Sequence, residues 1–300
     1  MNPENSSTPR RDIYARVTNQ IVAELERGVL PWIKPWHASH LNGRVQMPLR
    51  HNGLPYKGIN VIALWMASVG RGYSSPSWMT YRQAHELGGQ VRRGETGELV
   101  VYAGTLNKPS EGEGGEDDPR EIHYLRGYVV FNADQIDGLP EQYRPQATAL
   151  PEAPERIAKA ESFLDAVKAE VRHGGDKAYY AGGDDYIQMP PFEIFRDALS
   201  YYATRAHETV HWTSHKSRLD RTFDRKRFGD EGYAMEELVA ELGAAFLCSA
   251  LELTPEVMPN HASYIDTWLE VLLHDKRAIF TAAAHAQRAA DYLHGLQGGG

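Results

Sequence analysis

The segment from His207 to His211 holds two histidines four residues apart, with Glu208 directly after the first. No glycine or proline interrupts the surrounding sequence, ALSYYATRAHETVHWTSH, so a helix is expected. Residues four apart share a helix face, and both imidazoles can therefore bind one ion. Glu208 can then reach a water on that ion as general base. The spacing predicts metal-assisted hydrolysis, with two surface histidines on a helix as the ordinary alternative.

A third ligand is expected from the helical segment YAMEELVAELGAAFL, because catalytic zinc takes three protein ligands and keeps one position open. Glu237 and Glu241 share an otherwise apolar face, where a buried carboxylate needs a partner. We assign Glu237 as the third ligand and Glu241 as the carboxylate that orients a ligand histidine, while the reverse assignment stays open. Glu236 lies off this face and is expected to be solvated. This donor set suits one zinc ion best, although manganese or cobalt could bind.

The two histidines and the later glutamate resemble the ligands of the gluzincin metallopeptidases. That resemblance implies peptide-bond hydrolysis with Glu208 as base, and a substrate lying along an edge strand above the metal helix. DDYIQMPP, just before the helix, is the expected strand, with an ordinary edge strand as the alternative. Charge that develops in the transition state also needs a donor, for which Tyr233, Tyr264 and His261 are candidates.

A second set of residues, within residues 1–105, combines aromatic rings with cations. The 300-residue chain has a net charge of −8, which taken alone argues against a nucleic-acid partner. Residues 1–105, however, hold 12 Lys and Arg against 7 Asp and Glu, together with four of the six tryptophans. Bases can stack on rings while cations follow the phosphates, so single-stranded DNA binding is predicted; core rings and solvated charges are the alternatives. The candidate DNA-binding residues are Trp32, Lys34, Trp36, Arg50, Lys57, Trp78, Arg82, Arg92 and Arg93.

The elements that must position these residues indicate an α+β fold with two domains. In the first half, helices are expected over 12–27, 60–69 and 81–87, followed by a hairpin over 89–104 that exposes Arg92 and Arg93. Three prolines within residues 137–153, and a fourth directly after them, mark this segment as a linker. Residues 1–136 then form a mixed domain with a small antiparallel sheet. Residues 154–300 form a mainly helical domain with a short sheet beside the metal helix.

The cysteine content and the lack of long apolar segments indicate the cellular compartment. A single cysteine, Cys248, permits no internal disulfide, which fits a reducing environment. The first residues carry no apolar core of a signal peptide, and no stretch approaches the length of a membrane span. A cytoplasmic protein without a membrane partner is expected, and its oligomeric state stays open.

Both halves carry long motifs, among them RRDIYARVTNQIVAELERGVLPWIKPW, NGLPYKGINVIALWMA, YATRAHETVHWTSHKSRLDR and FGDEGYAMEELVAELGAAFLC. These motifs resemble those of the ArdC-type antirestriction proteins of conjugative plasmids. The first half is also similar to the start of certain plasmid primases. The resemblance implies a domain that binds single-stranded DNA, a zincin-like metallopeptidase domain, and protection of incoming plasmid DNA during conjugation. A host protein is the implied peptidase substrate.

Two alternatives belong to other functional classes. The protein could be a DNA-binding shield in which the metal is structural and no proteolysis occurs. A metal-dependent nuclease is disfavoured, because nucleases often use clustered carboxylates and two metals, whereas this site is rich in histidine.

Overall fold

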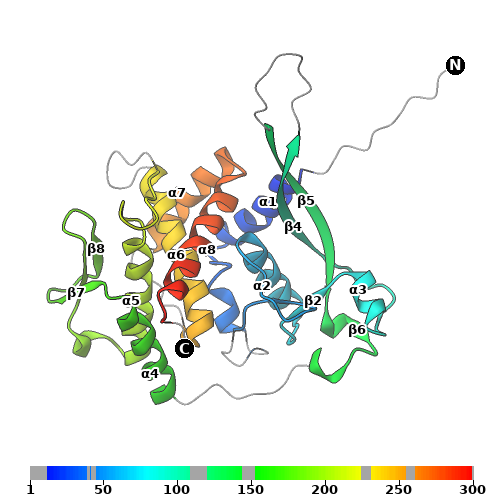
Figure 1. The fold of residues 1–300 in the computed structure, drawn as a ribbon, viewed down its shortest axis with the longest axis horizontal. Coiled ribbons are helices and arrows are strands. Elements are labelled where there is room, and N and C mark those ends of the chain that lie inside the picture. The colour runs from blue at the N-terminus through cyan, green and yellow to red at the C-terminus, as the bar shows by residue number, and fades with distance from the viewer. Residues whose placement is uncertain are drawn as a thin grey trace. The chain divides into compact units, whose positions relative to one another are not determined.

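The computed structural model describes residues 12–38, 41, 45–108, 120–143, 153–223, 231–254 and 261–298 (Figure 1). The α+β class is confirmed. By packing, the chain divides into two compact units. The helical unit comprises Met1–Met47, Lys57–Gly72 and Gln146–Gly300, and the sheet unit comprises Pro48–Tyr56 and Tyr73–Pro145.

The helical unit is built around a central helix, α6 (Glu231–Leu251), which packs against α5 (Ala198–Trp212) and α8 (Ala278–Gly295). An apolar helix of this kind can be buried on most sides, and most residues of α6 are buried. The other helices of the unit are α1 (Ile13–Leu25), α2 (Ile59–Arg71), α4 (Ala153–Ala166) and α7 (His261–His274), with 3-10 turns η1 (Lys34–His37) and η5 (Phe192–Ile194).

A three-stranded sheet accompanies α5 in the same unit, as the sequence predicts. Its order is β7 (Glu170–His173), β9 (Tyr186–Met189), β8 (Tyr179–Ala181). β7 runs parallel to β9, and β8 runs antiparallel to it. Both β8 and β9 lie against α5. The segment DDYIQMPP, expected to be an edge strand, therefore supplies the central strand instead, and β7 and β8 are the two edges.

Helices α1 and α2 pack with helices from the C-terminal part of the chain. α1 contacts α7, and α2 contacts α8. The Thr18 hydroxyl donates to the Lys276 carbonyl (2.7 Å), and Trp36 Nε1 donates to the Leu253 carbonyl (2.8 Å). The packing units therefore interleave in sequence, in contrast to the predicted division at 137–153, which follows the chain. The apolar sides of both helices find partners that are far away in sequence.

The sheet unit contains the expected small, mostly antiparallel sheet. Its strand order is β1 (Leu49–Arg50), β2 (Ser77–Met79), β5 (Arg120–Asn132), β4 (Glu98–Lys108), and only the β1–β2 pair is parallel. β3 (Gln90–Val91) pairs with β6 (Ile136–Asp137). Helix α3 (Tyr81–Glu86), capped by Thr80, covers a core that includes Met79, Val91 and Leu139. The 3-10 turns η3 (Ala133–Gln135) and η4 (Glu141–Tyr143) complete the unit.

The prediction of a hairpin over residues 89–104 is wrong. β4 pairs with β5, from Glu98 opposite Val130 to Lys108 opposite Arg120, and β3 turns away to β6. Gly97 permits this course, because a Cβ there would lie only 2.4 Å from a Val129 methyl group. Residues 92 and 93 consequently lie between β3 and β4. Figure 1 shows β4 and β5 as the two longest strands.

Several local predictions are confirmed by their hydrogen bonds. Asp12 caps α1 by accepting from Ala15 N (3.1 Å), and Thr80 forms a capping box with Gln83. Among the helices in the described ranges, none is long and apolar enough to cross a membrane.

Candidate metal centre

Helix α5 carries both histidines on one face. Asp197 caps the helix by accepting from Ser200 N at 2.7 Å. The helix is unbroken to Trp212, so His207 and His211 lie one turn apart with ring centroids separated by 5.0 Å. Local capping and the absence of breakers thus suffice to set the spacing of the two imidazoles.

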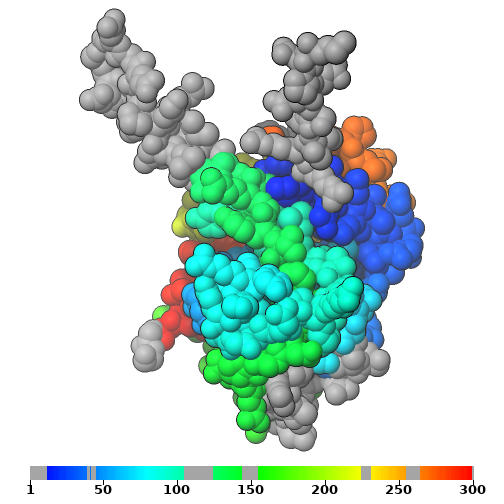
Figure 2. All heavy atoms as spheres, turned by 90° about the vertical axis from the view of Figure 1, so that its right-hand side faces the viewer, coloured from blue at the N-terminus to red at the C-terminus, as the bar shows by residue number. Residues whose placement is uncertain are grey.

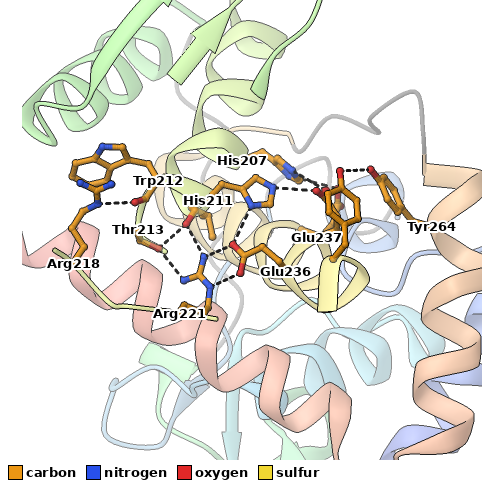
Figure 3. A network of polar contacts seen from close by, with 12 residues as sticks. His207, His211, Trp212, Thr213, Arg218, Arg221, Glu236, Glu237 and Tyr264 are labelled. Atoms are coloured by element: carbon orange, nitrogen blue, oxygen red, sulfur yellow. Dashed lines mark hydrogen bonds and ion pairs between the residues drawn. The ribbon is translucent and has the colours of Figure 1, made fainter. Parts of the chain in front are cut away.

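Glu237 of α6 reaches both rings. Its Oε2 lies 3.8 Å from His207 Nε2, and its Oε1 lies 3.6 Å from His211 Nε2. One ligand atom from each residue lies within 4.8 Å of the other two. Ligand atoms of a tetrahedral zinc site are separated by roughly 3.3 Å. The three predicted ligands are therefore brought together with nearly the spacing that a small divalent ion requires (Figure 3).

Each histidine is backed by a second carboxylate. His211 Nδ1 donates to Glu236 Oε1 at 3.1 Å, and His207 Nδ1 lies 3.6 Å from Glu241 Oε1. An ionised carboxylate only accepts hydrogen bonds, so Nδ1 of His211 carries a proton, and its Nε2 is the atom left for a metal. Glu241 thus stands where the sequence predicts, behind a ligand histidine.

Glu236 corrects the sequence analysis, because it is buried rather than solvated. Arg221 explains the difference. Its Nε and Nη2 atoms each donate to the Glu236 carboxylate at 2.7 Å, and the guanidinium also binds Thr213 Oγ1 and the Val210 carbonyl. The pair joins the residues after α5 to α6 (Figure 3). No local periodicity in the sequence indicates that Arg221 would compensate a glutamate on the next helix.

The protonation of the site is set by burial and by the surrounding carboxylates. Burial disfavours the charged form of His211, but Glu237 and Glu236 outweigh burial and raise its pKa to about 10. Burial also acts against ionised Glu237, yet the two histidines hold its pKa well below the ordinary carboxyl range. A divalent cation would replace the protons of the imidazoles as the positive partner of these carboxylates.

Glu208 is buried beside the two histidines but is not one of the three gathered residues. Burial raises the pKa of its carboxyl, while a hydrogen bond from the backbone of Tyr180 acts in the opposite direction. The edge strand β8 therefore touches the predicted base directly.

A polar clamp, formed by Tyr180, Asp185 and Arg218, fixes that edge strand. The Tyr180 hydroxyl donates to Asp185 Oδ1 at 2.8 Å, and Arg218 Nη1 donates to Asp185 Oδ2 at 2.9 Å. The guanidinium lies 3.8 Å over the Trp212 ring, and its Nε donates to the Trp212 carbonyl at 2.6 Å. The clamp ties β8 to the C-terminal end of α5. Sequence reasoning missed it, because its members join only in three dimensions.

Of the predicted transition-state donors, two lie beside the site. The hydroxyls of Tyr233 and Tyr264 are 3.0 Å apart, and Tyr233 hydrogen-bonds Glu237. Tyr264 also stacks on Trp268. Burial raises the pKa of Tyr233, so its hydroxyl stays protonated and can donate. The side chain of His261 lies outside the described part of the structure.

The tryptophans predicted to stack on bases are buried, and that prediction is wrong for all three. Trp32 donates through Nε1 to Glu241 Oε2 at 3.4 Å, and Trp36 donates to the Leu253 carbonyl. Trp78 is 1% exposed and packs edge-on against Tyr73. These rings fill the interiors of their units, and Trp32 helps to place a carboxylate of the metal centre.

The predicted DNA-binding cations lie at the surface, except that Lys34 is half-buried. Exposed ion pairs of this kind are worth little in water, so a phosphate could compete for the cations. Lys34 pairs with Glu24 (2.9 Å), Lys57 with Asp291 (2.8 Å), Arg82 with Glu86 (2.7 Å) and Arg92 with Glu95 (2.9 Å), while Arg50 lies over the Tyr56 ring and Arg93 is exposed.

Replacing Glu237 by Gln should remove the third ligand. We expect zinc affinity, measured by competition with a chromophoric chelator, to fall by more than the roughly 10–100-fold typical of an outer carboxylate. Glu241→Gln is the matched comparison and should stay within that smaller range. A larger loss of zinc affinity in Glu241→Gln than in Glu237→Gln would make Glu241 the ligand.

Two family descriptions match separate parts of the chain. Residues 11–131 match the N-terminal domain of anti-restriction factor ArdC, and residues 158–285 match a zincin-like metallopeptidase.

Solved structures and whole-chain relatives agree with these matches. The metal-free crystal structure of the antirestriction ArdC protein from the R388 plasmid has a TM-score of 0.80 and 48% identity, over 95% of this chain and 98% of that one. Its Mn(II)-bound structure has a TM-score of 0.79 and 46% identity, over 96% and 98% of the two chains. The protein y4eC of Sinorhizobium fredii (strain NBRC 101917 / NGR234) is 44% identical over 95% of this chain and 92% of its own length. DNA primase TraC of Escherichia coli is 36% identical over 95% of this chain, which spans only 27% of that primase.

Proposed function

Because the chain belongs to the ArdC family of antirestriction proteins, we propose that it is a divalent-metal peptidase that also binds single-stranded DNA. The observation that carries the peptidase proposal is the convergence of His207, His211 and Glu237 within 4.8 Å, with Glu208 on the same helix. A divalent metal is supported by the Mn(II)-bound relative. The donor set favours zinc, with manganese or cobalt as substitutes.

The chain supplies the groups that peptide hydrolysis needs. A zinc ion held by His207, His211 and Glu237 would supply Lewis-acid polarisation of the scissile carbonyl. Glu208 takes a proton from the attacking water and passes it to the leaving amine, and its burial favours the uptake of that proton. The paired hydroxyls of Tyr233 and Tyr264 can donate to the developing negative charge.

The single-stranded DNA proposal is supported by the match to the ArdC N-terminal domain and by the similarity to a DNA primase. Together, the two activities would protect incoming plasmid DNA from restriction during conjugation. The peptidase would cut a host protein while the other surface holds the strand. Both partners would be met in the cytoplasm, where we propose that the protein acts.

A shield without proteolysis is the second candidate. It is favoured by the buried contacts of Glu236 with His211 and Arg221, because an ion that ties α5 to α6 would also stabilise the fold. DNA occupancy alone would then give protection.

Metal removal separates the two candidates. Under the peptidase proposal, EDTA should abolish hydrolysis of denatured casein, and zinc or manganese should restore it, while oligo(dT) binding persists. Fluorescence anisotropy and casein cleavage, with far-UV circular dichroism as a folding control, would be measured on the same samples. No hydrolysis by the metal-loaded protein, with a lower thermal midpoint after EDTA, would favour the shield. Cleavage of the labelled strand itself would point to a nuclease.

A further inference from the structure

The β4–β5 pair carries an exposed aromatic row. The register places Tyr102 opposite Arg126, Val100 opposite Tyr128, and Gly104 opposite Tyr124. Directly opposed residues, and those two apart along a strand, share one face of a sheet. These six residues therefore form a single face, which we call the hairpin row. Tyr102 is 54% exposed and Tyr128 is 44% exposed, whereas Val100 is buried.

The rings of the hairpin row are held in a defined arrangement. A Cβ at Gly104 would lie 2.5 Å from the Tyr124 ring, so the glycine leaves the space that this ring occupies. The Tyr102 and Tyr124 rings are 6.3 Å apart, and the Arg126 guanidinium lies 5.0 Å over Tyr124. A cation thus lies over one tyrosine ring, and a second tyrosine ring lies beside the first. Figure 2 shows atoms of this part of the chain, in teal and green, on the face it presents.

Arg126 is the charged residue of the hairpin row. The backbone register of the two strands continues beyond the row to Lys108 opposite Arg120. Between the strands, however, residues 109–119 include five acids in sequence. Stacking, rather than charge alone, must therefore supply much of any affinity for a polyanion.

We propose that the hairpin row is the surface that binds single-stranded DNA, with bases stacked on Tyr102 and Tyr128 and Arg126 at the phosphates. The proposal rests on the proposed single-strand binding. Rings on opposed and diagonal positions of a strand pair lie roughly 5–8 Å apart, a spacing that successive unstacked bases can match. Duplex DNA keeps its bases stacked inside, so the row should prefer single strands.

The test uses fluorescence anisotropy of the full chain with a labelled 20-nucleotide oligo(dT). Tyr102→Ala and Tyr128→Ala should each weaken binding by about tenfold or more, and the Phe variants should retain affinity because the ring remains. Arg126→Ala should reduce the slope of log affinity against log salt by about one. Tyr81→Ala, at an exposed tyrosine of the same unit, is the matched control and should leave binding unchanged.

The outcomes separate this proposal from the one on which it rests. If the unaltered chain does not bind oligo(dT), the proposed single-strand binding is wrong, and the proposal for the hairpin row is wrong with it. If the unaltered chain binds, and a variant that combines Tyr102→Ala with Tyr128→Ala binds equally well, only the hairpin row is excluded. Selective loss in the alanine variants, with folding verified by circular dichroism and affinity retained by the Phe variants, supports it. A change of sedimentation in the alanine variants without loss of DNA binding would identify a contact between copies instead.

Discussion

Replacing Glu208 by Gln should lower peptide hydrolysis by about 10²–10⁴-fold while the protein still binds its metal. The amide keeps the size of the side chain and can still accept from the Tyr180 backbone, but it cannot take a proton from water. Glu208 is not among the three gathered ligands, so metal content should match that of the unaltered chain. Cleavage of a fluorogenic peptide and elemental analysis of the same preparation check both expectations.

Glu231→Gln is the matched control, because Glu231 is exposed in the first turn of α6. It should change neither hydrolysis nor metal content. Hydrolysis by Glu208→Gln at the unaltered rate would remove the assigned base. If Glu208→Gln loses hydrolysis but still protects DNA from restriction in cells, proteolysis is not the route to protection and the shield accounts for it.

The convergence of the three candidate ligands could be predicted, because their geometry is largely local. The four-residue spacing of His207 and His211 becomes a shared face as soon as α5 forms. Glu237 required one further step, since a carboxylate on an apolar helix face needs a partner. Glu236 could not be placed in the same way, because its burial depends on Arg221, which reaches it from the segment after α5.

The prediction that tryptophans stack on DNA bases failed, because it was made from composition and not from packing. Trp32 and Trp36 lie in a proline-rich turn that looks exposed in sequence, yet they pack against groups more than 200 residues away. The hairpin over 89–104 was predicted wrongly for a related reason. β3 pairs with β6, and β4 and β5 lie between these two strands in the sequence. The alternation of Tyr124, Arg126 and Tyr128 was a visible signal in the sequence. Only the register with β4 shows that Tyr102 joins them on one face.

Replacing Arg221 by Met should destabilise the helical unit by about 3–5 kcal/mol, because it removes the bidentate cation of the buried Glu236 carboxylate and leaves it only His211, which Glu237 shares. The Arg221 side chain is fully buried, and Glu236 is almost fully buried. Arg221 also satisfies Thr213 and the Val210 carbonyl at the end of α5. We expect the urea midpoint of the metal-free protein to fall and, because His211 loses a fixed partner on Nδ1, zinc affinity to fall with it.

Arg82→Met is the matched comparison, since Arg82 forms an exposed pair with Glu86 and should give no measurable change in midpoint. Adding Glu236→Gln to Arg221→Met removes the uncompensated charge and should recover part of the lost stability, without restoring metal affinity. Recovery of stability without recovery of metal affinity would separate the effect of Arg221 on folding from its effect on metal binding. Its charge permits a glutamate to be buried between α5 and α6, and the glutamate then orients the histidine that faces the ion. A midpoint for Arg221→Met equal to that of Arg82→Met would show that Glu236 is not held as a buried charge.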